Sequence, residues 1–259
     1  MESFPRATPL ITGALLAGAL IFLMPENAAH AAEACLDQTT LDAQQAANAV
    51  HLEEWVKAHW SSIVGDVERI SGMHINHASY MFVNDTGDFA RYNVHMHTVE
   101  LSTKTAQPFM ENPHVAGCEQ VYGPSTRAVL THEVGHDLFY QEHAALDTSG
   151  TLDTHWREYY ERQSAGAYVI YEGFARFIEN ESGEGVVNIA APDFALLNTD
   201  ADLQKFGADI GARMLRPIFS HVGVEKGLKA ILMTYPPSEY ELMNPDMYQA
   251  RILETAQKF

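Results

Sequence analysis

The strongest constraint on this chain is an HExxH pentapeptide at residues 132–136. Residues four apart lie on the same face of an α-helix, about one turn from each other, so the rings of His132 and His136 can converge on one ion. Glu133 is offset by one residue and can reach a water bound to that ion. Pro124 suits a first helical turn, and apolar residues recur after it. The pentapeptide therefore predicts a zinc site on a helix, with Glu133 as general base.

A catalytic zinc ion needs a third protein ligand and one open position. The metzincin spacing HExxHxxGxxH does not supply it, because Phe139 replaces the glycine, Glu142 replaces the third histidine and His143 lies one residue too late. The apolar pattern of residues 167–179 instead predicts a second helix that carries Glu172 in its middle. Burying an unpaired carboxylate is costly, and metal coordination would remove that cost.

The sequence EGFA at residues 172–175 resembles the EGxA segment that supplies the glutamate ligand in many bacterial gluzincin peptidases. It follows the second histidine of HExxH by 36 residues, and the resemblance covers mainly residues 123–180. The resemblance implies an exported zinc-dependent peptidase with a zincin-like fold. It implies three zinc ligands and one general base, namely His132, His136, Glu172 and Glu133. The alternative is a surface helix that carries two histidines and a glutamate by chance.

The chain departs from this family at Arg176. In the thermolysin-like branch, an aspartate at this position orients the first histidine ligand. A zinc-bound histidine usually donates its second N–H to a carboxylate or carbonyl, so another residue must take that role. Four carboxylates are available and the sequence does not choose among them: Asp137, Asp147, Asp153 and Glu179.

Hydrolysis of a peptide also requires a group that stabilises the tetrahedral oxyanion, commonly His, Tyr or Arg across the cleft. The candidates from the sequence are, in order, Tyr240, His221, His155 and Tyr235. We take Tyr240 and His221 as the predicted catalytic partners of Glu133.

The expected fold class is α+β. A helix over 38–72 precedes two strands at 79–84 and 89–101, which a hairpin turn at 85–88 would join. The resemblance implies a small, twisted, mainly antiparallel sheet ahead of the metal helix, with an edge strand that pairs with bound peptide. We expect 93–101 to form that edge.

The C-terminal half is expected to be largely helical, with helices over 154–181 and 186–235 and an interruption or kink at Pro217. The segment 235–248 breaks the helical pattern. It resembles a PP-S-x-E…HP-x-x-Y stretch of some exported bacterial proteins that also carry both zinc motifs, with Asn244 in place of that histidine. A proline-rich loop that caps the C-terminal helix is the alternative.

Residues 1–31 have the pattern of a cleaved signal peptide, with an early arginine, an apolar run and a small-x-small site. A retained membrane anchor is the alternative, but the apolar run is short for a span. We expect a secreted or periplasmic protein without stable membrane insertion. Residues 32–259 would form one domain with a 32–140 half that contains the sheet and the metal helix, and a helical 141–259 half.

Composition narrows the partners. The net charge is −18, from 34 acidic and 16 basic residues, which disfavours nucleic acid and anionic membranes as partners. Charge says little about the substrate, and it is the family resemblance that implies a peptide or protein substrate. Cys35 and Cys118 are the two cysteines, and an exported protein with two is expected to join them in a disulfide. The sequence leaves the oligomeric state open.

Two other functions compete with a peptidase. One is a zinc-binding but non-hydrolytic module that docks a partner on a peptidase scaffold. The other is a periplasmic metal-handling protein with a second metal site on His74, His77, His95 and His97. The intact HExxH favours the peptidase, because a binding role does not require Glu133.

Overall fold

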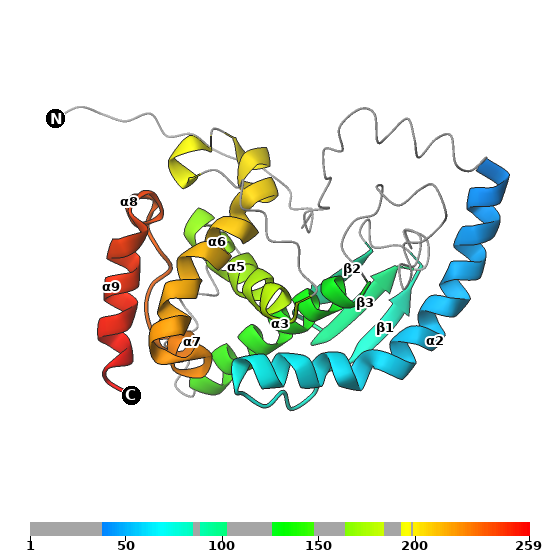
Figure 1. Ribbon diagram of the computed structural model, residues 1–259, viewed down its shortest axis with the longest axis horizontal. Coiled ribbons are helices and arrows are strands. Elements are labelled where there is room, and N and C mark those ends of the chain that lie inside the picture. The colour runs from blue at the N-terminus through cyan, green and yellow to red at the C-terminus, as the bar shows by residue number, and fades with distance from the viewer. Residues whose placement is uncertain (1–37, 85–88, 103–125, 148–163, 184–192, 198) are drawn as a thin grey trace.

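The computed structural model describes residues 38–84, 89–102, 126–147, 164–183, 193–197 and 199–259, with side chains from Leu52 onward. The predicted signal peptide, both cysteines, His155 and Asp153 lie outside these residues. The described part is a mixed α+β fold, mostly helical with one small sheet (Figure 1). Its elements are α2 (Gln38–Ser71), β1 (Tyr80–Val83), β2 (Ala90–Asn93), β3 (Thr98–Ser102), α3 (Thr126–Leu146), α5 (Ala165–Glu181), η1 (Phe194–Leu196), α6 (Asp200–Val222), α7 (Val224–Leu232), α8 (Glu239–Met243) and α9 (Pro245–Ala256).

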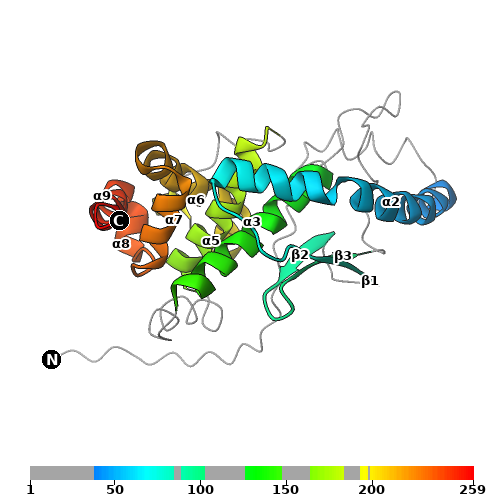
Figure 2. The same ribbon diagram turned by 90° about the horizontal axis from the view of Figure 1, so that it is seen from below.

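Helix α2 crosses over α3 and the sheet (Figure 2). Its buried side chains recur every three or four residues, as an amphipathic helix requires: Leu52, Val56, Trp60, Ile63 and Val67. Trp60 joins α2 to the first strand, because its indole N–H donates to the carbonyl of Ala78 at 3.2 Å and its ring lies 4.9 Å from that of Tyr80. The helix ends at Ser71 before Gly72, whose φ of 74° is typical of a residue that terminates a helix.

The sheet has the order β1-β3-β2, in which β1 pairs with β3 in parallel and β2 pairs with β3 antiparallel. The expected hairpin between the first two strands is therefore wrong, as is a mainly antiparallel sheet. The expected strand 89–101 is interrupted by a turn at 94–97. Asn93 builds this turn, because its side-chain oxygen accepts hydrogen bonds from the backbone N–H groups of His95 and Met96 at 3.1 and 3.2 Å.

The central position of β3 also corrects the expected edge at 93–101. The backbone of β3 pairs on both sides, so it has no free edge for a peptide. Among the described strands, the edges are β1 and β2. Strand β2 is the edge joined to α3, since the hydroxyl of Tyr92 donates to Asp137 at 2.9 Å.

Helix α5 lies between α3 and α6 (Figure 1). It crosses α6 at two glycines, Gly173 and Gly211. A Cβ built on Gly211 would lie 1.8 Å from the carbonyl oxygen of Val169, and one on Gly173 would lie 2.4 Å from the Cα of Gly211. Only residues without a side chain permit this approach, so the glycine of the EGFA sequence is a packing requirement of the fold.

The C-terminal helices follow the prediction in part. Helix α6 continues through Pro217 as one helix, so the expected interruption is not observed. The segment 235–248 contains a loop, α8 and the first residues of α9. Ser238 and Glu241 form a capping box at the start of α8, and Glu241 also binds Arg251 of α9 at 2.7 Å. This network supports the reading of the segment as a cap on the C-terminal helix.

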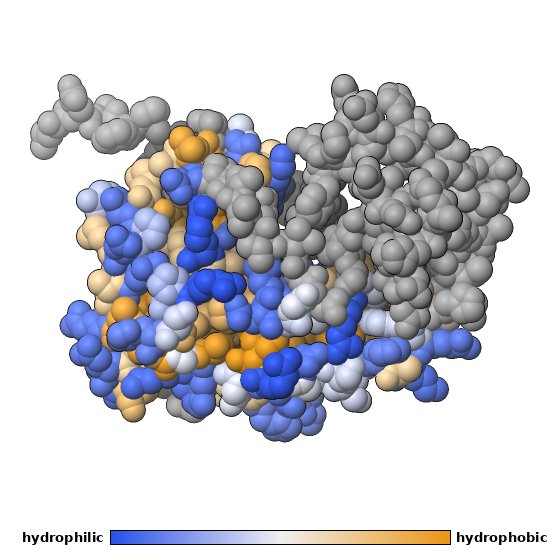
Figure 3. All heavy atoms as spheres, in the orientation of Figure 1, coloured by the Kyte–Doolittle hydropathy of each residue, from blue (hydrophilic) through white to orange (hydrophobic). Residues whose placement is uncertain are grey.

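The face shown in Figure 3 has hydrophilic residues around its described rim and a band of hydrophobic residues between them. Within the described part of the chain, no helix has the length and apolar character needed to cross a membrane.

The crossing of α5 and α6 makes a testable prediction about stability. Gly211→Ala should lower the free energy of unfolding by about 2–3 kcal/mol, because the new methyl group collides with backbone. Gly65→Ala is the matched control, since Gly65 is an exposed α2 residue with open space around it, and it should raise stability by about 0.5–1 kcal/mol. Urea denaturation measures both. Equal stability of Gly211→Ala and wild type would contradict this packing.

Candidate metal centre

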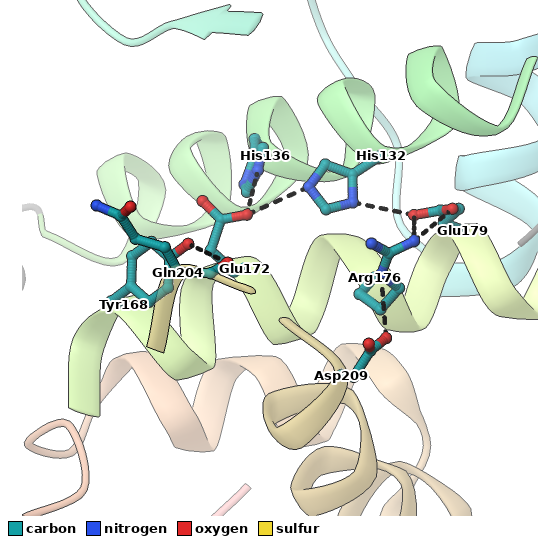
Figure 4. A network of polar contacts seen from close by, with 8 residues as sticks. All are labelled: His132, His136, Tyr168, Glu172, Arg176, Glu179, Gln204 and Asp209. Carbon is teal, nitrogen blue, oxygen red and sulfur yellow. Dashed lines mark hydrogen bonds and ion pairs between the residues drawn. The ribbon is translucent and has the colours of Figure 1, made fainter. Parts of the chain in front are cut away.

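Helices α3 and α5 bring together the three predicted ligands, His132, His136 and Glu172 (Figure 4). One donor atom from each lies within 4.8 Å of the other two. The Oε2 atom of Glu172 is 3.3 Å from Nε2 of His132 and 3.5 Å from Nε2 of His136. Among the described residues, this is the single group of three or more His, Cys, Asp or Glu side chains able to hold a metal ion.

The short distance between α3 and α5 has a local cause. A Cβ built on Gly135, inside the HExxH sequence, would lie 3.0 Å from the Cα of Ala175 in the EGFA sequence. These two small residues let the backbones approach, so that the carboxylate of Glu172 reaches both imidazoles of α3. The small residues of the two motifs therefore set the spacing of the ligands.

The second nitrogen of His132 is held by Glu179. Its Nδ1 atom lies 3.2 Å from Oε2 of Glu179, on the side of the ring opposite Glu172 (Figure 4). An ionised carboxylate only accepts hydrogen bonds, so Nδ1 carries the hydrogen and Nε2 faces the ligand group. Among the three candidate carboxylates that lie within the described residues, the structure thus selects Glu179, whereas Asp153 lies outside them.

Asp137 and Asp147, the other two candidates within the described residues, lie elsewhere. Asp137 is buried beside the sheet, where it accepts hydrogen bonds from the Tyr92 hydroxyl at 2.9 Å and from the Gln141 side chain at 3.1 Å. Asp147 directly follows the last residue of α3. The sequence alone could not choose Glu179, because the position of Glu179 relative to His132 depends on how α3 and α5 cross.

His136 is fixed by packing. Its ring stacks on that of Tyr171, with 4.1 Å between centroids and 22° between planes. Its Nδ1 atom is buried and has no hydrogen-bond partner among the described residues. A metal ion at Nε2 would therefore meet a ring whose orientation is set by an aromatic neighbour.

The electrostatics of the group favour a cation. Burial alone would lower the pKa of His132, but the carboxylates of Glu172 and Glu179 outweigh burial and raise that pKa to about 10. Burial would raise the pKa of Glu172, yet His136 and His132 hold it below its usual range. Burial lowers the pKa of His136. Without a metal, a proton on His132 supplies the positive charge between the carboxylates.

Glu133 lies on α3 beside the first ligand and is 9% exposed. Its negative charge also contributes to the raised pKa of His132. Its predicted role as general base depends on a bound water and stays a prediction.

The structure does not bring Tyr240 or His221 into the ligand group. Tyr240 lies on α8 and is 59% exposed. His221 is exposed in the last turn of α6, about 15 Å along the helix axis from Gly211, which packs against Gly173, the residue after Glu172. Their assignment as oxyanion-stabilising residues stays a prediction without support from a contact.

The proposed second metal site is not formed by the described residues. His95 and His97 lie exposed in the turn between β2 and β3, so they do not alternate on a strand face. The ring of His97 contacts Tyr140 with 4.8 Å between centroids, and His74 binds Glu68 at 2.5 Å. Among the described residues, the histidines outside HExxH form no group able to hold a metal ion.

Comparison with known protein families, with curated proteins and with solved structures finds no match. The described residues define a mixed α+β protein with a His–His–Glu group able to hold a metal ion. A functional assignment therefore rests on the geometry and chemistry of this group.

The charge state of His132 predicts how metal binding depends on pH. Its pKa is raised from 6.5 to about 10, so the proton is held at pH 7 and an incoming ion must displace it. His136 is already neutral and Glu172 already ionised, so about one proton should be released per ion. Zinc affinity should rise about tenfold per pH unit between about pH 7 and 8.5.

Calorimetry of zinc binding in buffers of different ionisation enthalpy measures the released protons. The same linkage has a second consequence. The stability that protonated His132 gives to the metal-free protein is fully present below about pH 6.5 and is lost as pH rises through about 10. Zinc binding without proton release at pH 7 would show that His132 is neutral.

Proposed function

We propose that this protein is an exported zinc-dependent peptidase, which hydrolyses peptide bonds with Glu133 as general base. The observation that carries the proposal is the convergence of His132, His136 and Glu172 from two crossing helices. Two imidazoles and one carboxylate are a donor set of catalytic zinc sites and leave one coordination position open. Export itself is a prediction from residues 1–31.

Each residue would have one role in hydrolysis. A zinc ion held by the three ligands supplies a Lewis acid that activates water and polarises the scissile carbonyl. Glu133 would accept the proton of the attacking water and pass it to the leaving amine. Glu179 would keep the hydrogen of His132 on Nδ1, so that Nε2 remains a donor to the metal.

A peptide substrate would pair with the outer edge of β2. This edge is next to the metal helix, because Tyr92 of β2 binds Asp137 of α3, the residue after His136. An extended peptide added to a strand gains backbone hydrogen bonds regardless of its sequence, which suits a substrate recognised mainly by its main chain.

The ligand assignment is tested by measuring bound zinc. Wild-type protein should hold one zinc per chain, and Glu172→Ala should lose it or bind it far more weakly because the site keeps only two ligands. Glu181→Ala is the control, since Glu181 lies on the same helix and pairs with Arg216. Elemental analysis after dialysis gives the stoichiometry. Zinc retained in Glu172→Ala would remove Glu172 as a ligand.

The reaction is tested with Glu133→Gln on a peptide library. Removing a general base typically lowers turnover by about 10²–10⁴-fold, while all three ligands remain to hold zinc. Glu142→Gln changes the same helix away from the ligand group and should keep activity. Cleavage by Glu133→Gln at the wild-type rate would exclude the mechanism. A zinc-loaded wild type that cleaves no peptide would favour the non-hydrolytic partner-binding module.

A further inference from the structure

Arg176 occupies the position where the family resemblance places an aspartate, yet it points into the polar network of the metal centre (Figure 4). Its Nη1 atom lies 2.7 Å from both carboxylate oxygens of Glu179. The two side chains are only 5% and 3% exposed, so this ion pair is almost completely desolvated. Glu179 in turn accepts the hydrogen bond from Nδ1 of His132.

The opposite side of Arg176 faces α6. Its Nε atom lies 3.5 Å from Oδ1 of Asp209, whose side chain is 9% exposed. Arg176 therefore lies between two buried carboxylates from different helices (Figure 4). The sequence of groups is imidazole, carboxylate, guanidinium and carboxylate, from His132 through Glu179 and Arg176 to Asp209.

This order has a physical consequence for His132. A buried carboxylate needs a positive partner, and a guanidinium at both oxygens also fixes the plane of the carboxylate. Without Arg176, the Glu179 side chain would be free to adopt another rotamer and would leave Nδ1 of His132 without its acceptor. Arg176 cannot accept a hydrogen bond, so it acts on His132 only through Glu179.

We propose that Arg176 is a positioning residue of the metal centre, which holds Glu179 so that His132 presents Nε2 to the ion, with Asp209 anchoring the guanidinium from α6. The inference rests on the proposed zinc site and assigns a role to the residue that departs from the family pattern. In this chain the orienting carboxylate is Glu179, seven residues after the ligand Glu172, and Arg176 between them fixes its geometry.

A second ion pair between the same helices supplies a matched control. Arg216 of α6 binds Glu181 of α5 at 2.8 Å, with side chains 51% and 37% exposed. Among the described residues, neither partner bonds to His132. If Arg176 only joined α5 to α6, replacing Arg176 or Arg216 would have the same kind of effect on the metal centre. If Arg176 positions Glu179, only the replacement of Arg176 should change zinc binding.

The test compares Arg176→Met with Arg216→Met, since methionine keeps much of the apolar stem and removes the charge. Zinc affinity is measured by competition with a chromophoric chelator, and the geometry of the site by the visible spectrum of the cobalt-substituted protein. Arg176→Met should bind zinc about 10–100-fold more weakly, the usual effect of losing an outer partner of a ligand, and should change the cobalt spectrum. Arg216→Met should leave both unchanged.

Arg176→Lys covers the case in which Arg176→Met fails to fold. Lysine keeps the charge, but its single ammonium cannot reproduce the planar contacts to Glu179 and Asp209, so it should weaken zinc binding less than methionine and still alter the cobalt spectrum. The inference would be overturned if folded Arg176→Met had the zinc affinity and the cobalt spectrum of the wild type. Where Arg176→Met does not fold, the same result for Arg176→Lys would overturn it. Absence of zinc from the wild type would instead overturn the proposed function.

Discussion

The convergence of His132, His136 and Glu172 depends on how closely α5 approaches α3 and α6. Gly173 meets Gly211 of α6, and Ala175 meets Gly135 of α3, so backbone lies against backbone on both sides of the helix. With larger residues at these contacts, α5 would move away and the carboxylate of Glu172 would no longer reach the two imidazoles. The HExxH and EGFA sequences therefore have two roles in this structure. They carry His132, His136 and Glu172, and their small residues set the distance between the helices.

Close approach in turn forces the buried charges into a definite order. Glu172 and Glu179 lie on either side of His132, and Arg176 separates Glu179 from Asp209. Each buried acid has a positive or hydrogen-bonding neighbour, as the cost of desolvation requires. Replacing buried ion pairs with apolar residues is often neutral for stability, so these pairs are weak evidence for a stabilising role.

The sequence predicted the site better than the sheet, because the site follows from short spacings. HExxH places two imidazoles on one helical face, and the apolar surroundings of Glu172 indicate the third member; the structure confirms that the three converge. Strand order depends on contacts between distant residues, and the alternating pattern of 89–101 concealed the turn that Asn93 builds. Glu179 was one of four candidates because its choice requires the crossing of α3 with α5. From the sequence, Arg176 was recognised only as a departure from the family pattern, because its contacts depend on where Glu179 and Asp209 lie in the fold.

The ligands come from helices separated by a stretch of chain that includes residues 148–163, outside the described part. An ion held by His136 and Glu172 would close a loop of about 36 residues, as a covalent cross-link does, and would lower the entropy of the unfolded chain. Such a bond is reversible and depends on the supply of metal. The free energy of unfolding would then rise with the free concentration of an ion that fits this site.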